Sequence, residues 1–302
     1  MENTLSATKN TKTITTYDWL VFFGLSIIWG FSFFFIKKGL EVFEPLEVAA
    51  FRMSIAFLTF TPLLFINRKK LKIDKRKRKW IPLLGLFGNL IPAILFCEAG
   101  AKIDSALSGI MNSTTPLFAL SIGGLYFGVT LTQNKIVGVL VGFIGAIIIV
   151  LSKQSITHIN PYILFPLFAT ICYGLNANIF KQYFQHDNPI IIALLQYTFV
   201  GSIAILYLLY SGGITKIIQQ PEYCWHSLKY LLLLGVLGTA VAQVYFNILA
   251  QRTSALFATM TTYVIPIVSI IVGVFIGEKI QFLHLVGLAI ILVGIYIGSR
   301  NN

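Results

Sequence analysis

The stretch PLEVAAFRMSIAFLTFTPLLFI, residues 45–66, is long and apolar enough to cross the hydrocarbon core of a bilayer as a helix. It nevertheless carries Arg52 well inside one end, although inserting an arginine near a helix centre costs about 2.5–3.5 kcal/mol. Charges placed at such a cost usually face the interior of a helix bundle. This span is therefore expected to belong to a larger assembly of membrane helices.

The composition of the whole chain also indicates a membrane protein. Of its 302 residues, 56% are hydrophobic and 11% are charged, whereas soluble domains average about 25% charged residues. Apolar runs of spanning length recur from Trp19 to Ile297, without the two-residue alternation of barrel strands. Because lipid offers no hydrogen bonds to the backbone, we expect an all-α polytopic membrane protein.

Charge clusters, prolines and turn residues divide the chain into ten expected transmembrane helices. They lie near residues 19–37, 46–66, 80–99, 105–127, 134–151, 161–182, 189–210, 229–249, 255–276 and 281–298. The connection at 67–80, NRKKLKIDKRKRKW, holds nine of the 23 basic residues and lacks interleaved aromatic residues. Such a loop stays cytoplasmic, so both termini are expected in the cytoplasm and no nucleic-acid partner is expected.

An internal repeat runs through the chain. WGFSFFFIK at 29–37 corresponds to YGLNANIFK at 173–181, and Arg52 corresponds to Gln196 at the same offset. The predicted organisation is an N-terminal tail (1–18), a first five-helix repeat (19–151), a linker (152–160), a second five-helix repeat (161–298) and a C-terminal tail (299–302). Five helices is an odd number, so the repeats are inverted, which is typical of secondary transporters that work by alternating access.

The same residues resemble a known family. A WG pair with a downstream lysine, AAFRMSIAF, and SAL…PLFAL…G…G…G recurring as SAL…PIVSI…GE…G…G are similar to the EamA branch of the drug/metabolite transporter superfamily. The resemblance covers residues 17–298 and implies a ten-helix permease in the inner membrane of bacteria. One departure is that Gly277–Glu278 of the second half corresponds to Gly128–Val129 of the first half.

Polar residues inside the spans are the candidates for a substrate path. Arg52 lies on a face of small and polar residues, about 10 Å along its helix from Pro45. Glu98 is a candidate partner for this charge, and its protonation would allow proton coupling. The alternatives are a structural arginine that binds helix-end carbonyls and a solvated glutamate at headgroup level. The remaining candidates are Trp29, Asn112, Tyr173, Gln196, Gln243, Asn247, Thr262 and Tyr263.

These candidates occupy three kinds of position. Thr239, Gln243 and Asn247 form a stripe on one helix face, which could bind substrate or hold helices together. Asn112 and the pair Thr262–Tyr263 precede mid-helix prolines, where a bent polar segment or a plain kink is expected. Trp29 and Tyr173 precede the glycines of the repeat, and such rings serve either stacking or packing.

An enzyme is not expected, because the chain has no GxSxG, HExxH or paired-aspartate pattern. Its three cysteines lack metal-ligand spacing, so no metal or cofactor is expected. We therefore expect a secondary transporter in the cytoplasmic membrane that exports a small metabolite, such as an amino acid or a related amphipathic compound. It would act as a monomer or homodimer, driven by proton coupling or substrate exchange. A channel-like or facilitated-diffusion pore remains an alternative, as does a non-catalytic receptor or scaffold.

Overall fold

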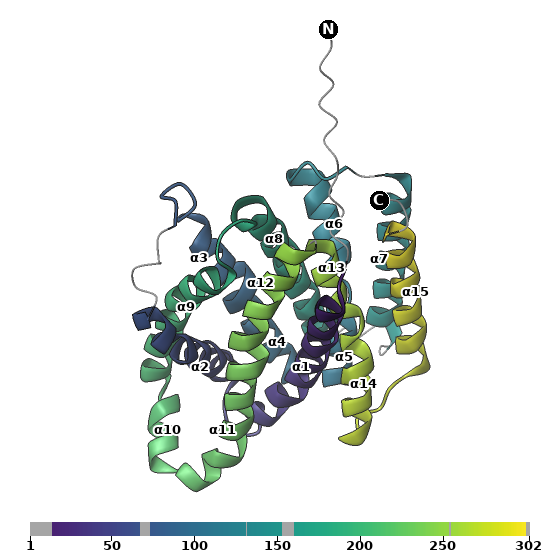
Figure 1. Cartoon of the computed structure of the whole chain (residues 1–302). Coiled ribbons are helices and arrows are strands. Elements are labelled where there is room, and N and C mark those ends of the chain that lie inside the picture. Colours follow the sequence, from purple (N-terminus) through teal and green to yellow (C-terminus); the bar gives the residue numbers. More distant parts are fainter. Residues whose placement is uncertain (1–13, 67–72, 131, 153–159, 254, 300–302) are drawn as a thin grey trace.

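A computed structural model describes residues 14–66, 73–130, 132–152, 160–253 and 255–299, and Figure 1 shows their arrangement. These residues form helices and turns without a strand, which confirms the predicted all-helical fold. The outer parts of both predicted tails, most of the predicted linker, and residues 67–72 of the basic connection lie outside the described residues.

The helices follow the predicted spans closely. They are α1 (Thr16–Leu40), α2 (Pro45–Ile66), α3 (Trp80–Gly85), η2 (Leu86–Leu90), α4 (Ile91–Gly100), α5 (Ser105–Asn112), α6 (Thr115–Tyr126), α7 (Gln133–Ser152), η3 (Pro161–Ile163), α8 (Leu164–Phe184), α9 (Pro189–Ser211), α10 (Gly213–Gln219), α11 (Pro221–Gly235), η4 (Val236–Val241), α12 (Ala242–Arg252), α13 (Ala255–Thr259), η5 (Met260–Tyr263), α14 (Ile265–Phe275) and α15 (Phe282–Ser299).

Seven helices of the described chain are long and apolar enough to cross a membrane, so the protein is a multi-pass membrane protein. The expected span 105–127 is not among them, because it is broken into α5 and α6. The apolar parts of α7 and α15, Gln133–Ile149 and Phe282–Gly298, are shorter than the other spans. The span expected to begin at residue 229 instead begins at Pro221, and the unexpected helix α10 precedes it at the lower end of Figure 1.

Two helices are broken where a proline lies in the first turn of the second segment. Pro116 lies in the first turn of α6 and Pro266 in the first turn of α14, so each ring removes one backbone donor there. Hydroxyl groups bind the carbonyls near the breaks: Thr114 donates to Met111 O at 2.8 Å, and Thr262 donates to Thr259 O at 2.8 Å. The predicted polar bends of the fourth and ninth spans are therefore confirmed as helix breaks.

The third and eighth spans each contain one π-helical turn, at η2 and η4. Each turn follows a glycine, Gly85 or Gly235, in matching positions of the repeats. In each turn a side chain reaches back five residues: Asn89 Nδ2 donates to Leu84 O at 3.5 Å, and Thr239 Oγ1 donates to Leu234 O at 2.8 Å. A π-turn widens the helix and interrupts its regular hydrogen bonds, and such turns occur frequently at functional sites.

The last helices of the two halves, α7 and α15, lie side by side at the right of Figure 1. Glycines let their backbones approach closely. A Cβ atom on Gly294 would lie 2.5 Å from the backbone nitrogen of Gly142 and 2.6 Å from the carbonyl oxygen of Gly138. Close approach through small residues is the usual means of helix association in lipid, where no hydrophobic driving force acts between helices.

The main core joins both halves of the chain. Its buried side chains include Met53 of α2, Phe96 of α4, Leu194 of α9 and Leu234 of α11. Helices α2 and α9, which correspond in the repeat, also pack against each other. The centre of the molecule is therefore the contact between the repeats, and the polar cavity described below lies there.

Candidate functional site

A cavity lies between the two halves of the chain, and its wall comes from broken, π-helical and regular segments. The centres of water-sized molecules can occupy about 90 Å³ of it, which is room for several waters because one water needs about 10–15 Å³ by this measure. Its lining residues are Trp29, Ser32, Phe33, Ile36, Arg52, Met53, Gly88, Asn89, Phe96, Asn112, Thr115, Tyr173, Asn176, Tyr197, Gly238, Thr239, Gln243, Phe246, Thr259 and Thr262.

Six of the ten candidate residues line this cavity: Trp29, Arg52, Asn112, Tyr173, Gln243 and Thr262. Glu98, Gln196, Asn247 and Tyr263 are not part of its wall. Gln196 and Asn247 each bind a lining residue, whereas Tyr263 is packed in a separate apolar cluster. The structure therefore brings most of the candidates together and separates them from Glu98.

Arg52 is the charged member of the wall, and it is 8% exposed. Its Nε donates to Thr239 Oγ1 at 2.6 Å, and one terminal nitrogen donates to Gly238 O at 3.4 Å. The structure describes both Arg52 and Glu98 and shows no ion pair between them, so the candidate pairing is not formed here. The guanidinium instead reaches across to the π-turn of the other repeat.

The matching residue Gln196 makes the mirrored contact. Its Oε1 accepts a hydrogen bond from Asn89 Nδ2 at 3.2 Å, and Asn89 lies in the π-turn of the first repeat. Asn89 also accepts a hydrogen bond from the hydroxyl of Tyr197. Arg52 and Gln196 correspond in the repeat, as do Thr239 and Asn89, so the structure pairs two sets of equivalent residues across the halves.

The π-turn of the second repeat supplies a carbonyl to the cavity wall. Gly238 O accepts from Trp29 Nε1 at 3.1 Å as well as from Arg52. Trp29 is thereby fixed in orientation, with its ring against Phe246 at a centroid distance of 5.6 Å. One carbonyl of the π-turn thus positions both an aromatic ring and the cationic group of the wall.

Asn176 lines the cavity although it is not among the candidates from the sequence, and Asn178 of the same helix points to a different side. Asn178 donates to Ala119 O and Gly174 O, away from the cavity, whereas Asn176 lines it. The Oδ1 atom of Asn176 is buried without a hydrogen-bond partner. Its correspondence to Ser32, which also lines the wall, is the sequence signal that could have identified it.

The remaining candidates occupy supporting positions. Gln243 Nε2 donates to Asn247 Oδ1 at 3.0 Å, and Asn247 Nδ2 donates to Pro189 O at 3.4 Å. Asn247 therefore orients Gln243 from one turn further along α12. The hydroxyl of Tyr263 is buried without a hydrogen-bond partner.

The chemistry of the wall is one positive charge, several amides and hydroxyls, and a set of aromatic rings. Its lining residues include no Asp or Glu. The described residues contain no group of three or more His, Cys, Asp or Glu side chains that could hold a metal ion. Such a cavity can bind a small amphipathic molecule through an acidic group, hydrogen bonds and ring contacts.

Replacing Gln196 by leucine is expected to lower the stability of the protein. The change removes the acceptor of Asn89 Nδ2 inside a buried network, and leaving a buried polar group unpaired costs about 1–3 kcal/mol. The melting temperature in detergent should fall, whereas Gln185→Leu, at an exposed position after α8, should leave it unchanged. Equal melting temperatures for the two variants would show that the Asn89 contact contributes nothing.

Comparison with known proteins identifies the fold's family. The EamA-like transporter family matches residues 17–151 and again residues 160–300. This chain belongs to the EamA-like transporter family. The membership confirms the resemblance seen in the sequence, and the EamA-like chain is therefore a membrane transporter by family rather than an enzyme.

Relatives of the EamA-like chain cover nearly its whole length. An uncharacterized transporter of Archaeoglobus fulgidus is 23% identical over 94% of this chain and 99% of the relative. A probable amino-acid metabolite efflux pump of Salmonella typhimurium is 23% identical, over 90% of this chain and 91% of that protein. The uncharacterized inner membrane transporter YedA of Escherichia coli K12 is 24% identical, over 90% of this chain and 88% of that protein.

A solved crystal structure shares the fold. It superposes with a TM-score of 0.62 at 14% identity, covering 94% of this EamA-like chain and 97% of that chain. At this identity the likeness shows a common arrangement of helices.

Proposed function

We propose that this EamA-like protein is a secondary transporter that exports a small amphipathic carboxylate, such as an amino acid or a related metabolite, by alternating access. The proposal includes ten membrane spans arranged as two inverted repeats, with both termini in the cytoplasm. Transport would be driven by proton coupling or substrate exchange, and the chain would act as a monomer or homodimer.

The observation that carries this proposal is the charge of the cavity. Arg52 is the one ionised side chain of its wall, and the wall has no acidic residue to neutralise it. A buried guanidinium is costly unless it is paired, and it binds carboxylates through two parallel hydrogen bonds. A substrate carboxylate would supply the missing charge, and the amide groups of Asn112 and Asn176 would bind polar groups beside it.

The rest of the wall favours an amphipathic substrate. Trp29, Phe33, Phe96, Tyr173 and Phe246 offer aromatic surface around the polar groups, and ligand sites commonly combine such rings with a few placed polar groups. The direction of transport is supported by relatives whose names describe probable efflux pumps for amino-acid metabolites.

Uptake into proteoliposomes tests the proposed function. The purified protein would be assayed with amino acids, nucleobases and aromatic cations, and with the amide of each amino acid as a matched compound without a carboxylate. We expect saturable uptake of a carboxylate, stimulated by the same compound on the opposite side, and no uptake of its amide. Flux that never saturates and shows no trans-stimulation would instead indicate a channel-like pore.

Replacing Glu98 by glutamine tests proton coupling. Glu98 is half-buried on α4 outside the cavity wall, and it stays the candidate for a proton-binding carboxylate. The variant should reduce the dependence of transport on pH, because glutamine cannot take up a proton as a carboxylate does. An unchanged pH profile would contradict proton coupling through Glu98.

A further inference from the structure

Two short helix connections lie at opposite ends of α1. The segment between α4 and α5 lies near Lys37 through Glu278, and the end of α12 lies near Asp18, which binds Arg252. Lys37 and Asp18 are 19 residues apart on α1, which is about 28 Å along a helix that rises 1.5 Å per residue. The two connections are therefore at opposite faces of the molecule.

Glu278 holds the first connection. Its Oε1 accepts from the backbone nitrogen and hydroxyl of Ser105, each at 2.8 Å, and its Oε2 accepts from Ala106 N at 2.9 Å. The same carboxylate pairs with Lys37 Nζ at 3.1 Å, and its side chain is 6% exposed. One buried carboxylate from the segment between α14 and α15 thus caps α5 and binds α1.

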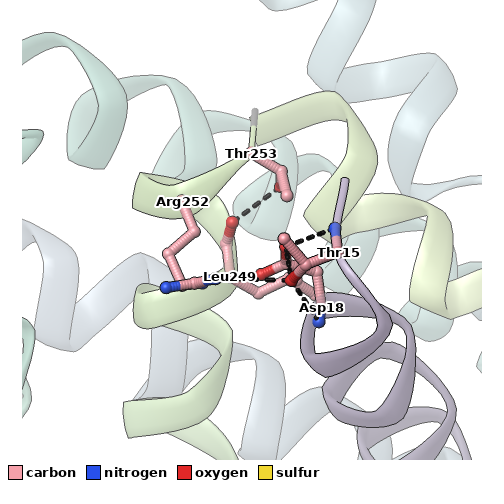
Figure 2. Close-up of polar contacts among 5 residues, drawn as sticks. All are labelled: Thr15, Asp18, Leu249, Arg252 and Thr253. Atoms are coloured by element: carbon pink, nitrogen blue, oxygen red, sulfur yellow. Dashed lines mark hydrogen bonds and ion pairs between the residues drawn. The ribbon is translucent and has the colours of Figure 1, made fainter. Parts of the chain in front are cut away.

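Asp18 holds the second connection, as Figure 2 shows. Its Oδ1 accepts from Arg252 Nε at 2.6 Å, and Arg252 is the last residue of α12. Its Oδ2 accepts from the backbone nitrogen and hydroxyl of Thr15. Asp18 is 2% exposed. A single buried carboxylate again ties a helix end of one repeat to the other repeat.

These two carboxylates break the symmetry of the repeats. The position that corresponds to Glu278 in the first half is Val129, and the position that corresponds to Asp18 in the second half is Tyr162. Tyr162 faces Lys102 through a cation–π contact of 5.9 Å, which replaces the ion pair of the other face. Each connection is therefore held by one carboxylate, supplied from a different element on each face.

Both contacts act on helices that reach the cavity. Glu278 caps the first residues of α5, and Asn112 at the other end of α5 lines the cavity. Asp18 binds the last residue of α12, and Gln243 near the start of α12 lines the same cavity. Release of either carboxylate would free the outer end of a helix whose inner end touches the substrate space.

We propose that Glu278 and Asp18 are two separate latches, each of which holds one face of the transporter closed. This inference rests on the proposed alternating access, because it assigns one latch to each access state. Loss of the Glu278 latch favours opening on its face, which is extracellular in the proposed topology, and loss of the Asp18 latch favours opening on the cytoplasmic face. Because the two carboxylates come from different elements, the opening energies of the two faces can be set independently.

Labelling of a single cysteine tests the two latches without a known substrate. Ser32 in the cavity wall would be changed to cysteine after replacement of Cys97, Cys172 and Cys224 by alanine. A membrane-impermeant maleimide would then be applied to right-side-out and inside-out vesicles. We expect Glu278→Gln to raise labelling from outside and Asp18→Asn to raise it from the cytoplasmic side, each roughly tenfold, because charge-assisted hydrogen bonds are lost.

Matched variants keep the result interpretable. Glu41→Gln removes an exposed ion pair with Lys38 at the same end of α1 as Glu278, and it should leave both labelling rates unchanged. If Glu278→Gln or Asp18→Asn fails to fold, Lys37→Gln and Arg252→Gln weaken the same contacts and should act in the same directions. The latch proposal would be overturned if each variant changed the labelling rate equally from both sides of the membrane, or if no variant changed it. A failed substrate screen would contradict only the proposed function.

Discussion

Replacing Arg52 by glutamine is expected to reduce transport strongly while the protein still folds. The substrate carboxylate would lose a charged hydrogen-bond partner worth about 1.5–3 kcal/mol, which raises the half-saturation concentration roughly ten- to a hundredfold. Folding should persist, because the second repeat already carries a glutamine at the equivalent position, where Gln196 pairs with Asn89. A glutamine at position 52 can make the corresponding contact with Thr239. Transport kinetics in proteoliposomes and size-exclusion chromatography measure both effects.

Arg52→Lys is the matched control for charge. It keeps the positive charge but not the planar pair of donors, so its transport should lie between those of the wild-type protein and Arg52→Gln. Loss of folded protein in Arg52→Gln would instead indicate a purely structural arginine. Wild-type kinetics in that variant would remove Arg52 from the substrate site.

Replacing Gly294 by leucine is expected to abolish the native packing of α7 against α15. The new Cβ atom would meet the backbone nitrogen of Gly142 and the carbonyl oxygen of Gly138, at 2.5 and 2.6 Å. Backbone atoms of a rigid helix cannot move aside as a flexible side chain can, so the helices must separate. Overpacking usually costs about 1–3 kcal/mol, and a clash with backbone belongs at or above the upper end.

Gly24→Leu provides the control for this prediction. A Cβ atom on Gly24 has no heavy atom within 4 Å, so the same substitution on α1 meets open space. Fluorescence-detected size-exclusion chromatography should show a monodisperse peak for Gly24→Leu and loss of that peak for Gly294→Leu. A native elution profile with the wild-type melting temperature in Gly294→Leu would contradict the close helix contact.

The positions of the helices and the heights of the polar groups could be predicted from the sequence. Apolar runs and prolines mark span ends because lipid imposes a fixed helix length and internal hydrogen bonding. The repeat also placed Arg52 and Gln196 at equivalent heights, and the structure shows that they make equivalent contacts. Local composition and internal comparison were sufficient for this level of detail.

The partners of the polar groups could not be predicted in the same way. Glu98 was a candidate partner of Arg52 because both lie toward the outer side on first-repeat helices, but the partner in the structure, Thr239, is 187 residues away. A side chain's partner depends on the rotation of its helix, which neither spacing nor hydropathy determines. The π-turns at η2 and η4 add to this difficulty, since they rotate the residues that follow.

Thr262 and Tyr263 show the same limit over one residue. Both were expected in the substrate path, yet Thr262 lines the cavity and Tyr263 packs elsewhere. They lie in the 3₁₀ turn η5, where three residues complete one turn and neighbours point about 120° apart. The rotation of this turn decides which of the two faces the cavity, and the hydroxyl-rich sequence does not reveal that rotation.

The glycine contact between α7 and α15 has a consequence for biosynthesis. Helix α7 is made about half a chain length before α15, so its glycine face must wait in the bilayer without its partner while the second half is synthesised. A chain truncated before α15 would leave that groove of accessible backbone open to lipid.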